Sequence, residues 1–574
     1  MNNFDEIKNF KRGNIGLAQL NFIAGDIEYN AKKIVKNINL AQDMNLDLVV
    51  FPEMSLVGYP LKDTVSRHPF LIDENIKWLK EIAKLTTKIT AIIGFLGVNN
   101  TSAIAVVSNG KIQKIIEDIS QIEINGIEYS ISTSKDDVED EKAQVIIKCF
   151  NTSSRKNKEQ NISNLLSYIA KTNNKPLVYL NQVGATDNYS FDGASRVYDK
   201  NGELFAQAKS FEEDFLIVNP LENYGKISPI TKGLDEQIEE SFSLDYENDL
   251  ERVYKTIIQG IRDYFNKNGL ERAVLGLSGG LDSTVASVLL ADALGKENVF
   301  GVSMPSKITS DESRNDAEEL AKNLGIHYTE MPIKSMVDTT NEVFAELFSE
   351  VEKGWDCRYQ KSFTQDNIQA RSRAIYLWGI ANEFSKCVSI ATSDKSELYM
   401  GYATINGDMS GGFAPIADVT KTKLFALARW LNKNREVKNA IPESIILKRP
   451  GAELAIDERT GKPLCAEDAL MPYEFLDEII WRVEHKQETY NDMLNSEFVY
   501  EKTHSVSKEQ KQEWLEKFYR RMSFALFKWS IMPPSVIVDT HSINSSDYNQ
   551  PVATSRIDYK GHSEEQIREI LENV

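Results

Sequence analysis

The stretch Leu275-Gly-Leu-Ser-Gly-Gly-Leu-Asp-Ser-Thr284 decides the expected fold of the second half of this 574-residue chain. Apolar residues lead into it from Arg272 and indicate a buried strand, and Val285 to Leu294 has the pattern of a helix. A strand, a glycine turn and a helix in this order bend the backbone so that several N–H groups point at one anion. The stretch therefore predicts a phosphate-binding loop.

The residue types inside the loop make this prediction more specific. Gly279 and Gly280 lack a Cβ, so the backbone can approach a phosphate closely. Asp282 would repel a phosphate unless a cation lies between them, which indicates Mg²⁺. The alternative is an ordinary strand-to-helix turn with a serine cap. A bare Ser-Gly-Gly would fit that alternative, but Ser-Gly-Gly-x-Asp-Ser-Thr between a strand and a helix favours a nucleotide site.

Length and composition limit the possible classes of protein. A chain of this length is expected to form at least two domains. Its net charge of −19 argues against a broad surface for nucleic acid or for an acidic membrane. We expect a cytoplasmic protein, because the start has no signal-peptide pattern and no apolar run is long enough to span a bilayer. The cysteines are scattered, which fits a reducing compartment and argues against structural zinc: Cys149, Cys357, Cys387 and Cys465.

The first 100 residues alternate between strand and helix patterns. This alternation predicts an α/β sheet, whose chemistry lies beyond the carboxyl ends of the strands. Glu53 falls at such a strand end, although a solvated loop acid is an equally plain interpretation of this one residue. The expected strands cover residues 14–20, 46–51 and 91–96, and the expected helices cover 27–43 and 73–85.

Several motifs in this half resemble the carbon–nitrogen hydrolase (nitrilase) superfamily. They are Gly16-Leu-Ala-Gln-Leu20, Asp47-Leu-Val-Val-Phe-Pro-Glu53, Leu56-Val-Gly-Tyr-Pro60, Tyr179-Leu-Asn-Gln-Val-Gly184 and Phe191-Asp-Gly-Ala-Ser195. The later ones look like the end of this domain in glutamine-dependent NAD⁺ synthetases. The resemblance implies an α-β-β-α sandwich that releases ammonia from glutamine with a Glu–Lys–Cys triad, in which the cysteine is the nucleophile.

This chain matches the triad only in part. Glu53 matches the glutamate, but Asp118 stands where the family has its lysine, and the Cys-Glu-Asp segment is missing. A polar segment, residues 118–144, takes its place, and its acid-rich run 135–142 predicts a solvated loop. Cys149 lies inside the next expected strand, so we interpret it as a buried structural cysteine. We therefore predict a degenerate glutaminase domain that has kept its fold and lost its reaction.

The domain boundaries follow from pattern changes along the chain. Residues 1–222 form the nitrilase-like domain, and the polar, weakly patterned residues 223–247 form a linker. Residues 248–574 form the second domain with a C-terminal extension. It opens with a helix from Asp249, whose apolar residues recur every three or four positions.

Ordered motifs in the second domain resemble NAD⁺ synthetase, of the ATP-pyrophosphatase (PP-loop) superfamily. The resemblance covers about residues 250–480 and implies a doubly wound parallel sheet. Its motifs after the phosphate loop are Met304-Pro-Ser-Lys-Ile-Thr-Ser310, Asn367-Ile-Gln-Ala-Arg371, Ser393-Asp-Lys-Ser-Glu397, Gly401 to Asp408, and Phe413 to Lys421.

The resemblance also implies the chemistry and its residues. Nicotinic acid adenine dinucleotide is adenylated by ATP, pyrophosphate leaves, and ammonia displaces AMP to give the amide. Asp408 would bind ammonium and accept its proton. Asp282 and Glu397 would ligate Mg²⁺, and Arg371 and Lys395 would contact the dinucleotide together with Asp408. The residues expected at ATP are Ser278, Gly279, Gly280, Asp282, Ser283, Thr284, Thr392 and Lys421.

We therefore expect a carbon–nitrogen ligase that makes NAD⁺ with ATP and Mg²⁺, using free ammonia because the lysine and cysteine of the triad are absent. One alternative is glutamine hydrolysis by this chain or by a partner glutaminase. Another is a non-catalytic scaffold or regulatory protein, which the intact loop argues against. The resemblance further implies a homo-oligomer, at least a dimer through the synthetase domain.

Overall fold

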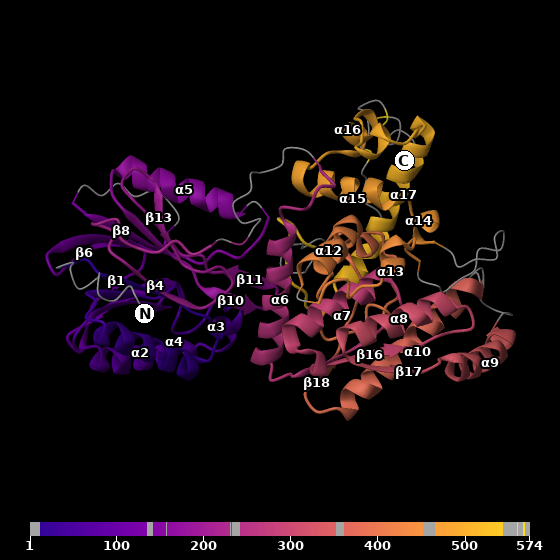
Figure 1. Cartoon of the computed structure of the whole chain (residues 1–574), viewed down its shortest axis with the longest axis horizontal. Coiled ribbons are helices and arrows are strands. Elements are labelled where there is room, and N and C mark those ends of the chain that lie inside the picture. The colour runs from indigo at the N-terminus through magenta and orange to yellow at the C-terminus, as the bar shows by residue number, and fades with distance from the viewer. Residues whose placement is uncertain are drawn as a thin grey trace. The chain divides into compact units, whose positions relative to one another are not determined.

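The computed structural model describes residues 12–134, 142–156, 158–229, 231, 242–351, 361–435, 437–451, 465–543, 560, 566 and 568. The chain forms two compact units, Met1–Ile238 with Glu251–Lys267 and Glu239–Leu250 with Asn268–Val574 (Figure 1). Helix α6 (Leu250–Lys267) therefore belongs to the first unit almost entirely, whereas the expected boundary at residue 248 placed it in the second domain. Part of the expected linker, residues 230 and 232–241, lies outside the described residues.

The first unit is a layered α/β sandwich. In its described part, one six-stranded sheet runs in the order β14-β1-β2-β3-β4-β5 and the other in the order β13-β12-β9-β8-β7-β6. Helices α2 and α4 cover the first sheet and α5 covers the second (Figure 1). The bounds are β1 (Ile15–Gln19), α2 (Ile27–Asp43), β2 (Leu48–Val50), α3 (Thr64–Arg67), α4 (Phe70–Leu85), β3 (Thr90–Leu96), β4 (Ser102–Ser108), β5 (Lys111–Ile116), β6 (Ile119–Ile124), β7 (Ile127–Ser132), β8 (Val145–Cys149), α5 (Lys158–Asn173), β9 (Leu177–Leu180), β10 (Val183–Thr186), β11 (Tyr189–Asp192), β12 (Arg196–Tyr198), β13 (Leu204–Gln207) and β14 (Asp214–Val218).

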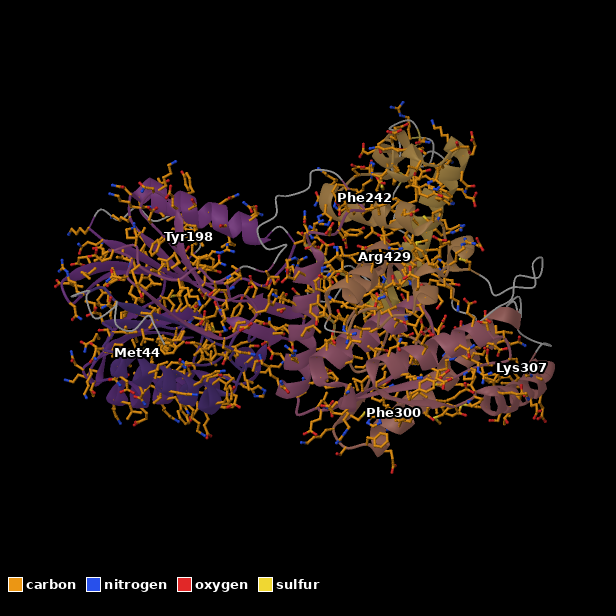
Figure 2. All side chains as sticks on the ribbon, in the orientation of Figure 1. Met44, Tyr198, Phe242, Phe300, Lys307 and Arg429 are labelled. Carbon is orange, nitrogen blue, oxygen red and sulfur yellow. The ribbon has the colours of Figure 1, made fainter. Side chains whose placement is uncertain are left out.

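Apolar periodicity explains these layers. The buried residues of α2 recur at intervals of three or four, for example Ile27, Ala31, Ile34 and Ile38, which gives the helix one face against the sheet. Strand residues that point away from the helices form a second core between the two sheets. Figure 2 shows side chains filling the space between the layers. The predicted α-β-β-α sandwich is therefore confirmed.

The polar segment between β5 and β8 contains structure that its composition does not suggest. Strands β6 and β7 pair as an antiparallel hairpin, and β7 runs parallel to β8. The inward residues Ile127, Tyr129 and Ile131 are buried in the core between the sheets, which explains why this short segment joins the sheet. The acid-rich run expected to be a loop lies outside the described residues from 135 to 141.

The second unit contains a parallel sheet. In the order β17-β16-β15-β18, every described pair of neighbouring strands is parallel. Helix α10 packs on one face through Leu377 and Ala381, against Val274 and Val302. The bounds are β15 (Arg272–Gly276), α7 (Leu281–Leu294), β16 (Val299–Ser303), α8 (Asp311–Leu324), β17 (His327–Glu330), α9 (Lys334–Val351), α10 (Lys361–Glu383) and β18 (Cys387–Ser389). Helix α7 begins four residues earlier than predicted, because Gly280 already serves as its N-cap.

The rest of the second unit is mainly helical and supports the sheet edge. Buried aromatic side chains join α11, α15 and α17, as in the packing of Tyr399 against Phe518 and Trp529. A π-helical turn, η2 (Arg482–Lys486), continues α15. The bounds are α11 (Lys395–Tyr399), α12 (Lys421–Asn434), α13 (Glu443–Leu447), α14 (Ala466–Ala469), α15 (Tyr473–Trp481), α16 (Tyr490–Asn495) and α17 (Lys508–Trp529). None of the helices that the structure describes is long and apolar enough to cross a membrane.

Candidate functional site

The loop between β15 and α7 has the sharp bend that its glycines predict. Gly279 has φ +73°, and a Cβ there would lie 2.1 Å from the carbonyl oxygen of Ser313, so only glycine fits. The N–H of Gly280 donates to the hydroxyl oxygen of Ser278 at 3.2 Å. The hydroxyl groups of Ser278 and Ser283 lie 3.1 Å apart. The loop thus places two hydroxyls and a tight backbone turn at the carboxyl end of a central strand.

A cavity of about 250 Å³ opens in front of this loop. It lies at the carboxyl ends of β15 and β16, the position expected for ligands in an open parallel sheet. Most of the predicted site residues line it, together with three basic residues that were not predicted. These lining residues are Ser278, Gly280, Asp282, Ser283, Thr392, Glu397, Asp408 and Lys421, with Arg373, Lys448 and Arg449.

A charged cluster lies at the base of the cavity. The ammonium of Lys421 is 2.7 Å from Asp282 Oδ1, 2.7 Å from Asp394 Oδ2 and 3.0 Å from Glu397 Oε1. Lys421 is 1% exposed, and its pKa is well above its ordinary value because the three carboxylates outweigh the effect of burial, which would lower it. Such a lysine stays charged throughout the physiological pH range.

The cluster has more negative charge than Lys421 can balance. Burial raises the pKa of Glu397 to about 8, and the neighbouring Asp394 and Asp282 add to this effect while Lys421 opposes it. Burial also raises the pKa of Asp282. The nearest oxygens of the three carboxylates lie within 4.8 Å of one another. Carboxylate oxygens with uncompensated charge are suitable ligands for Mg²⁺, so the residues fit this ion.

Asp408 lies on the cavity wall, with its carboxylate open to the cavity. Its Oδ1 accepts a hydrogen bond of 2.6 Å from the N–H of Thr404. The surrounding protein raises the pKa of Asp408 to about 6 by reducing its hydration, although hydrogen bonds and Lys528 oppose the shift. A carboxylate with this pKa is ionised at pH 7 and is more basic than an ordinary aspartate.

Four predicted residues do not line the cavity. Thr284 is fully buried behind the loop, and Gly279 turns the backbone there without lining the cavity. Arg371 is exposed, and its Nε donates to the carbonyl of Ile405 at 3.1 Å. Lys395 is fully buried, and its Nζ lies 2.8 Å from Glu484 Oε2. The expected ligand contacts of Thr284, Gly279, Arg371 and Lys395 therefore stay predictions, while the side chains of Arg371 and Lys395 contact other parts of the protein in this structure.

The helical repeat explains why Lys395 and Arg371 do not line the cavity. Residues two apart on a helix point to opposite sides. On α11, Glu397 faces the cavity, so Lys395 points into the protein. On α10, Arg373 lines the cavity and donates to the carbonyl of Met304, while Arg371 faces outward.

Asp394 belongs to the charged cluster, although the sequence motifs did not assign it to the site. Its Oδ1 accepts from the N–H groups of Ser396 and Glu397, so it caps α11, and its Oδ2 contacts Lys421. An aspartate directly before a helix is usually interpreted as a cap alone. The signal that it does more is the short Asp-Lys-Ser-Glu spacing, which brings two carboxylates to one helix end.

The residues of the expected glutaminase triad form no comparable cluster in the first unit. Glu53 Oε2 accepts a hydrogen bond of 2.7 Å from the N–H of Asn151, which ties the ends of β2 and β8 together. Cys149 is fully buried, and burial, with a smaller contribution from Glu53, raises the pKa of its thiol. Asp118 is exposed. Burial disfavours the reactive thiolate, which supports the prediction that Cys149 is a structural thiol.

Two family models match the chain. The model described as NAD synthase matches residues 253–521, and the model described as carbon-nitrogen hydrolase matches residues 14–113. The first match contains the phosphate loop and the charged cluster. The second contains Glu53.

Curated proteins and solved structures extend the comparison. The glutamine-dependent NAD(+) synthetase of Thermotoga maritima is 36% identical over 526 residues, which cover 82% of this chain and 88% of that protein. That of Synechocystis is 31% identical, with 84% and 90% covered. The structure from Acinetobacter baumannii, in complex with adenosine diphosphate, is 25% identical with a TM-score of 0.66, and that from Cytophaga hutchinsonii is 19% identical with a TM-score of 0.74. Both cover 94% of this chain and 98% of their own.

Proposed function

The chain belongs to the NAD synthetase family, in the form that joins a nitrilase-like domain to an NAD synthase domain, and we propose that it converts nicotinic acid adenine dinucleotide to NAD⁺ with ATP. As a member of this family it is a carbon–nitrogen ligase that uses ATP. The observation that carries the proposal is the charged cluster beside the phosphate loop, in which buried Lys421 and Asp394 meet half-buried Asp282 and Glu397. A scaffold protein would gain nothing from the desolvation cost of such charges.

The first half-reaction joins the substrate carboxylate to the α-phosphate of ATP and releases pyrophosphate. Negative charge develops on phosphoryl oxygens in this step, so fixed donors stabilise its transition state. The N–H of Gly280 and the hydroxyls of Ser278 and Ser283 hold the phosphates, and Thr392 contacts the nucleotide from the cavity wall. Lys421 supplies a fixed positive charge. Asp282, Asp394 and Glu397 would hold Mg²⁺, which when bound neutralises phosphate charge.

The second half-reaction forms the amide. Ammonia attacks the carbonyl carbon of the adenylate, and AMP leaves with the electron pair of the broken carbon–oxygen bond. Asp408 binds ammonium at the cavity wall and accepts its proton, which frees the lone pair of nitrogen for attack. Its raised pKa suits it to this role, because it holds a proton better than an ordinary aspartate does.

Two nitrogen donors are supported by different observations. The names of the relatives support glutamine over free ammonia. The residues of the first unit support free ammonia, because Cys149 is buried with a raised pKa and Asp118 replaces the expected lysine. In both cases the second unit consumes ammonia, so the question is whether the first unit produces it.

One experiment tests the function and the donor together. The purified chain is given ATP, Mg²⁺ and nicotinic acid adenine dinucleotide, with either ammonium or glutamine, and NAD⁺ and glutamate are measured. NAD⁺ formation with ammonium supports the synthetase, and its absence with both donors would contradict it in favour of a regulatory role. Glutamate release that depends on the added chain would establish glutamine as a donor. A Cys149→Ala variant shows whether that thiol takes part.

A further inference from the structure

Helix α15 places a buried carboxylate behind the charged cluster. Asp477 is 1% exposed and does not line the cavity. Its Oδ1 accepts a hydrogen bond of 2.5 Å from the hydroxyl of Ser396 on α11. Its Oδ2 accepts bonds of 2.8 Å from the N–H and 2.7 Å from the hydroxyl of Thr422 on α12. One carboxylate thus joins the beginnings of two helices.

These bonds replace the cap that α12 lacks. The N-cap residue of α12, Thr420, makes no side-chain cap bond, although the first N–H groups of a helix need acceptors. The hydroxyl oxygen of Ser396 accepts from the N–H of Lys421 at 2.8 Å, and Asp477 accepts from that of Thr422. The first turn of α12 is therefore capped from α11 and α15.

The joined residues are direct neighbours of the charged cluster. Ser396 precedes Glu397 on α11, and Lys421 precedes Thr422 on α12. Asp477 consequently sets the position of Glu397 relative to Lys421, whose charged atoms lie 3.0 Å apart. The same helix also contributes Tyr473, whose hydroxyl donates to Glu397 Oε1 at 3.0 Å.

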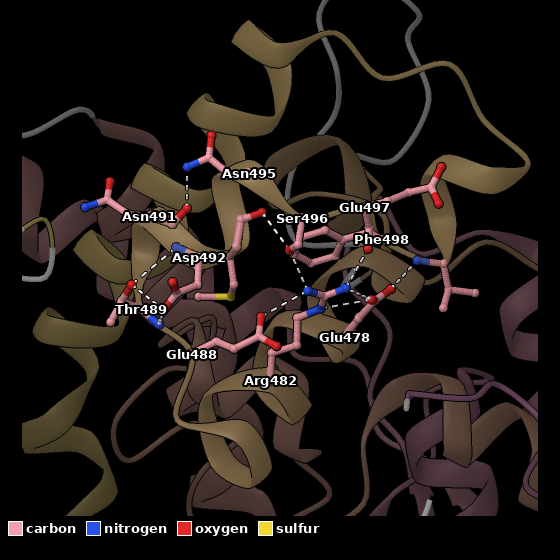
Figure 3. A network of polar contacts seen from close by, with 12 residues as sticks. Glu478, Arg482, Glu488, Thr489, Asn491, Asp492, Asn495, Ser496, Glu497 and Phe498 are labelled. Carbon is pink, nitrogen blue, oxygen red and sulfur yellow. Dashed lines mark hydrogen bonds and ion pairs between the residues drawn. The ribbon is translucent and has the colours of Figure 1, made fainter. Parts of the chain in front are cut away.

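A network of polar contacts lies at the other end of α15. Figure 3 shows Arg482 between Glu478, Glu488 and Ser496. Arg482 donates to Glu478 at 2.7 and 3.0 Å, to Glu488 at 3.0 Å and to Ser496 at 2.7 Å. These contacts join the end of α15 to Glu488 and Ser496, and they share no atom with the bonds that Asp477 makes to Ser396 and Thr422.

We propose that Asp477 is a positioning residue for amidation, which joins the starts of α11 and α12 and thereby holds Glu397 against Lys421. This inference rests on the proposed function, because that function gives Glu397 and Lys421 their roles. Asp477 touches no substrate in this arrangement. Its removal acts through geometry, and a displacement of about 1 Å in such a site costs roughly 100-fold in rate.

The test compares Asp477→Ala, Asp477→Asn and Glu478→Gln in the full chain. Glu478 is the matched control, because it is equally buried on the same helix but faces Arg482. We expect Asp477→Ala to lower kcat by roughly 100-fold and to raise the Mg²⁺ concentration that gives half-maximal turnover. Asparagine keeps one acceptor and should recover about tenfold of this loss. Glu478→Gln should stay within about twofold of wild type.

A purely structural role would reduce the folded fraction without changing the Mg²⁺ requirement, so circular dichroism and the Mg²⁺ titration are read together. Ser396→Ala combined with Asp477→Ala should lose no more activity than Asp477→Ala alone, because both residues act through the same chain of hydrogen bonds. A folded Asp477→Ala chain with the turnover and Mg²⁺ requirement of Glu478→Gln would overturn the inference. If the alanine variant does not fold, an unchanged Asp477→Asn enzyme overturns it equally. A wild-type chain that makes no NAD⁺ overturns the proposed function instead.

Discussion

Asp408 lines the cavity, but the surrounding protein removes part of its hydration. This desolvation raises the pKa of Asp408 to about 6. Only its ionised form can accept a proton from ammonium. Activity at saturating ammonium should therefore rise with pH from 5 to 7, with a midpoint near the pKa of about 6. Asp408→Asn should lose this dependence and about 100-fold or more of kcat, with ATP affinity retained. Initial rates and a nucleotide-binding titration measure both; normal turnover of the asparagine variant would refute the role.

Lys421 contacts Asp282, Asp394 and Glu397 through one ammonium group. Lys421→Met leaves these carboxylates without their partner, so adenylation should slow by roughly 100-fold to 1000-fold. ATP–pyrophosphate exchange in the presence of the dinucleotide measures this step alone. Lys423→Met is the matched control on the same helix, because Lys423 is buried against Asp249 outside the cavity. An equal loss in both variants would assign the effect to destabilisation.

The motifs named most of the residues that line the cavity, but they did not predict the direction of each side chain. Ser278, Asp282, Glu397, Asp408 and Lys421 all line the cavity, since each motif marks the start of a helix or the end of a strand. Lys395 and Arg371 were also predicted at the site but do not line the cavity, because a motif names neighbours along the chain, while a helix turns neighbours away from each other.

At the scale of elements, the network around Arg482 makes a prediction about stability. Arg482 and Glu478 are 11% and 1% exposed, so Arg482→Met leaves a buried carboxylate unpaired. We expect a loss of about 3 kcal/mol in unfolding free energy, measured by denaturant titration with hydrogen exchange at α15.

The exposed pair of Arg314 and Glu330 provides the control for this prediction. Their side chains are 41% and 32% exposed, so Arg314→Met should cost less than about 1 kcal/mol. If Arg482→Met and Arg314→Met lose similar unfolding free energies, burial does not determine the contribution of these ion pairs to stability.

Elements with strong periodicity were predicted closely. The expected helix at 27–43 coincides with α2, and the expected strands at 14–20 and 91–96 contain or nearly match β1 and β3. The hairpin of β6 and β7 could not be read from the sequence, because its inward residues are buried only once a second sheet faces them. Tertiary packing decides such segments, and local propensity does not.

At the scale of the whole molecule, the first unit is a packed sandwich that buries Cys149 between its two sheets. Cys149→Ala should therefore leave NAD⁺ formation within about twofold of wild type with either donor, since a buried thiol of raised pKa is a poor nucleophile. The rates of wild type and Cys149→Ala are compared with ammonium as well as with glutamine, because an effect on the second unit would change both rates. A selective loss of glutamine-supported turnover would instead identify Cys149 as the nucleophile.

The chain's sequence motifs assigned both units to known fold types, because each motif lies where a strand meets a loop. They could not assign α6, whose contacts place it in the first unit. The side chain of Asp263 accepts from the amide of Asn21 at 2.9 Å, and Gln259 donates to Ser190 at 2.6 Å. A buried polar contact of this kind leaves no periodic pattern in the sequence.

Two long helices, α7 and α12, begin at the cavity, with Leu281, Asp282 and Lys421 at their first positions. The aligned peptide dipoles of each helix place roughly half a positive charge at that end. This part of the electric field belongs to the backbone, so it neither titrates with pH nor disappears when a side chain is replaced. Variants that lose Lys421 or a loop hydroxyl should consequently keep a residual attraction for polyphosphate, and catalysis in this protein should fail before nucleotide binding does.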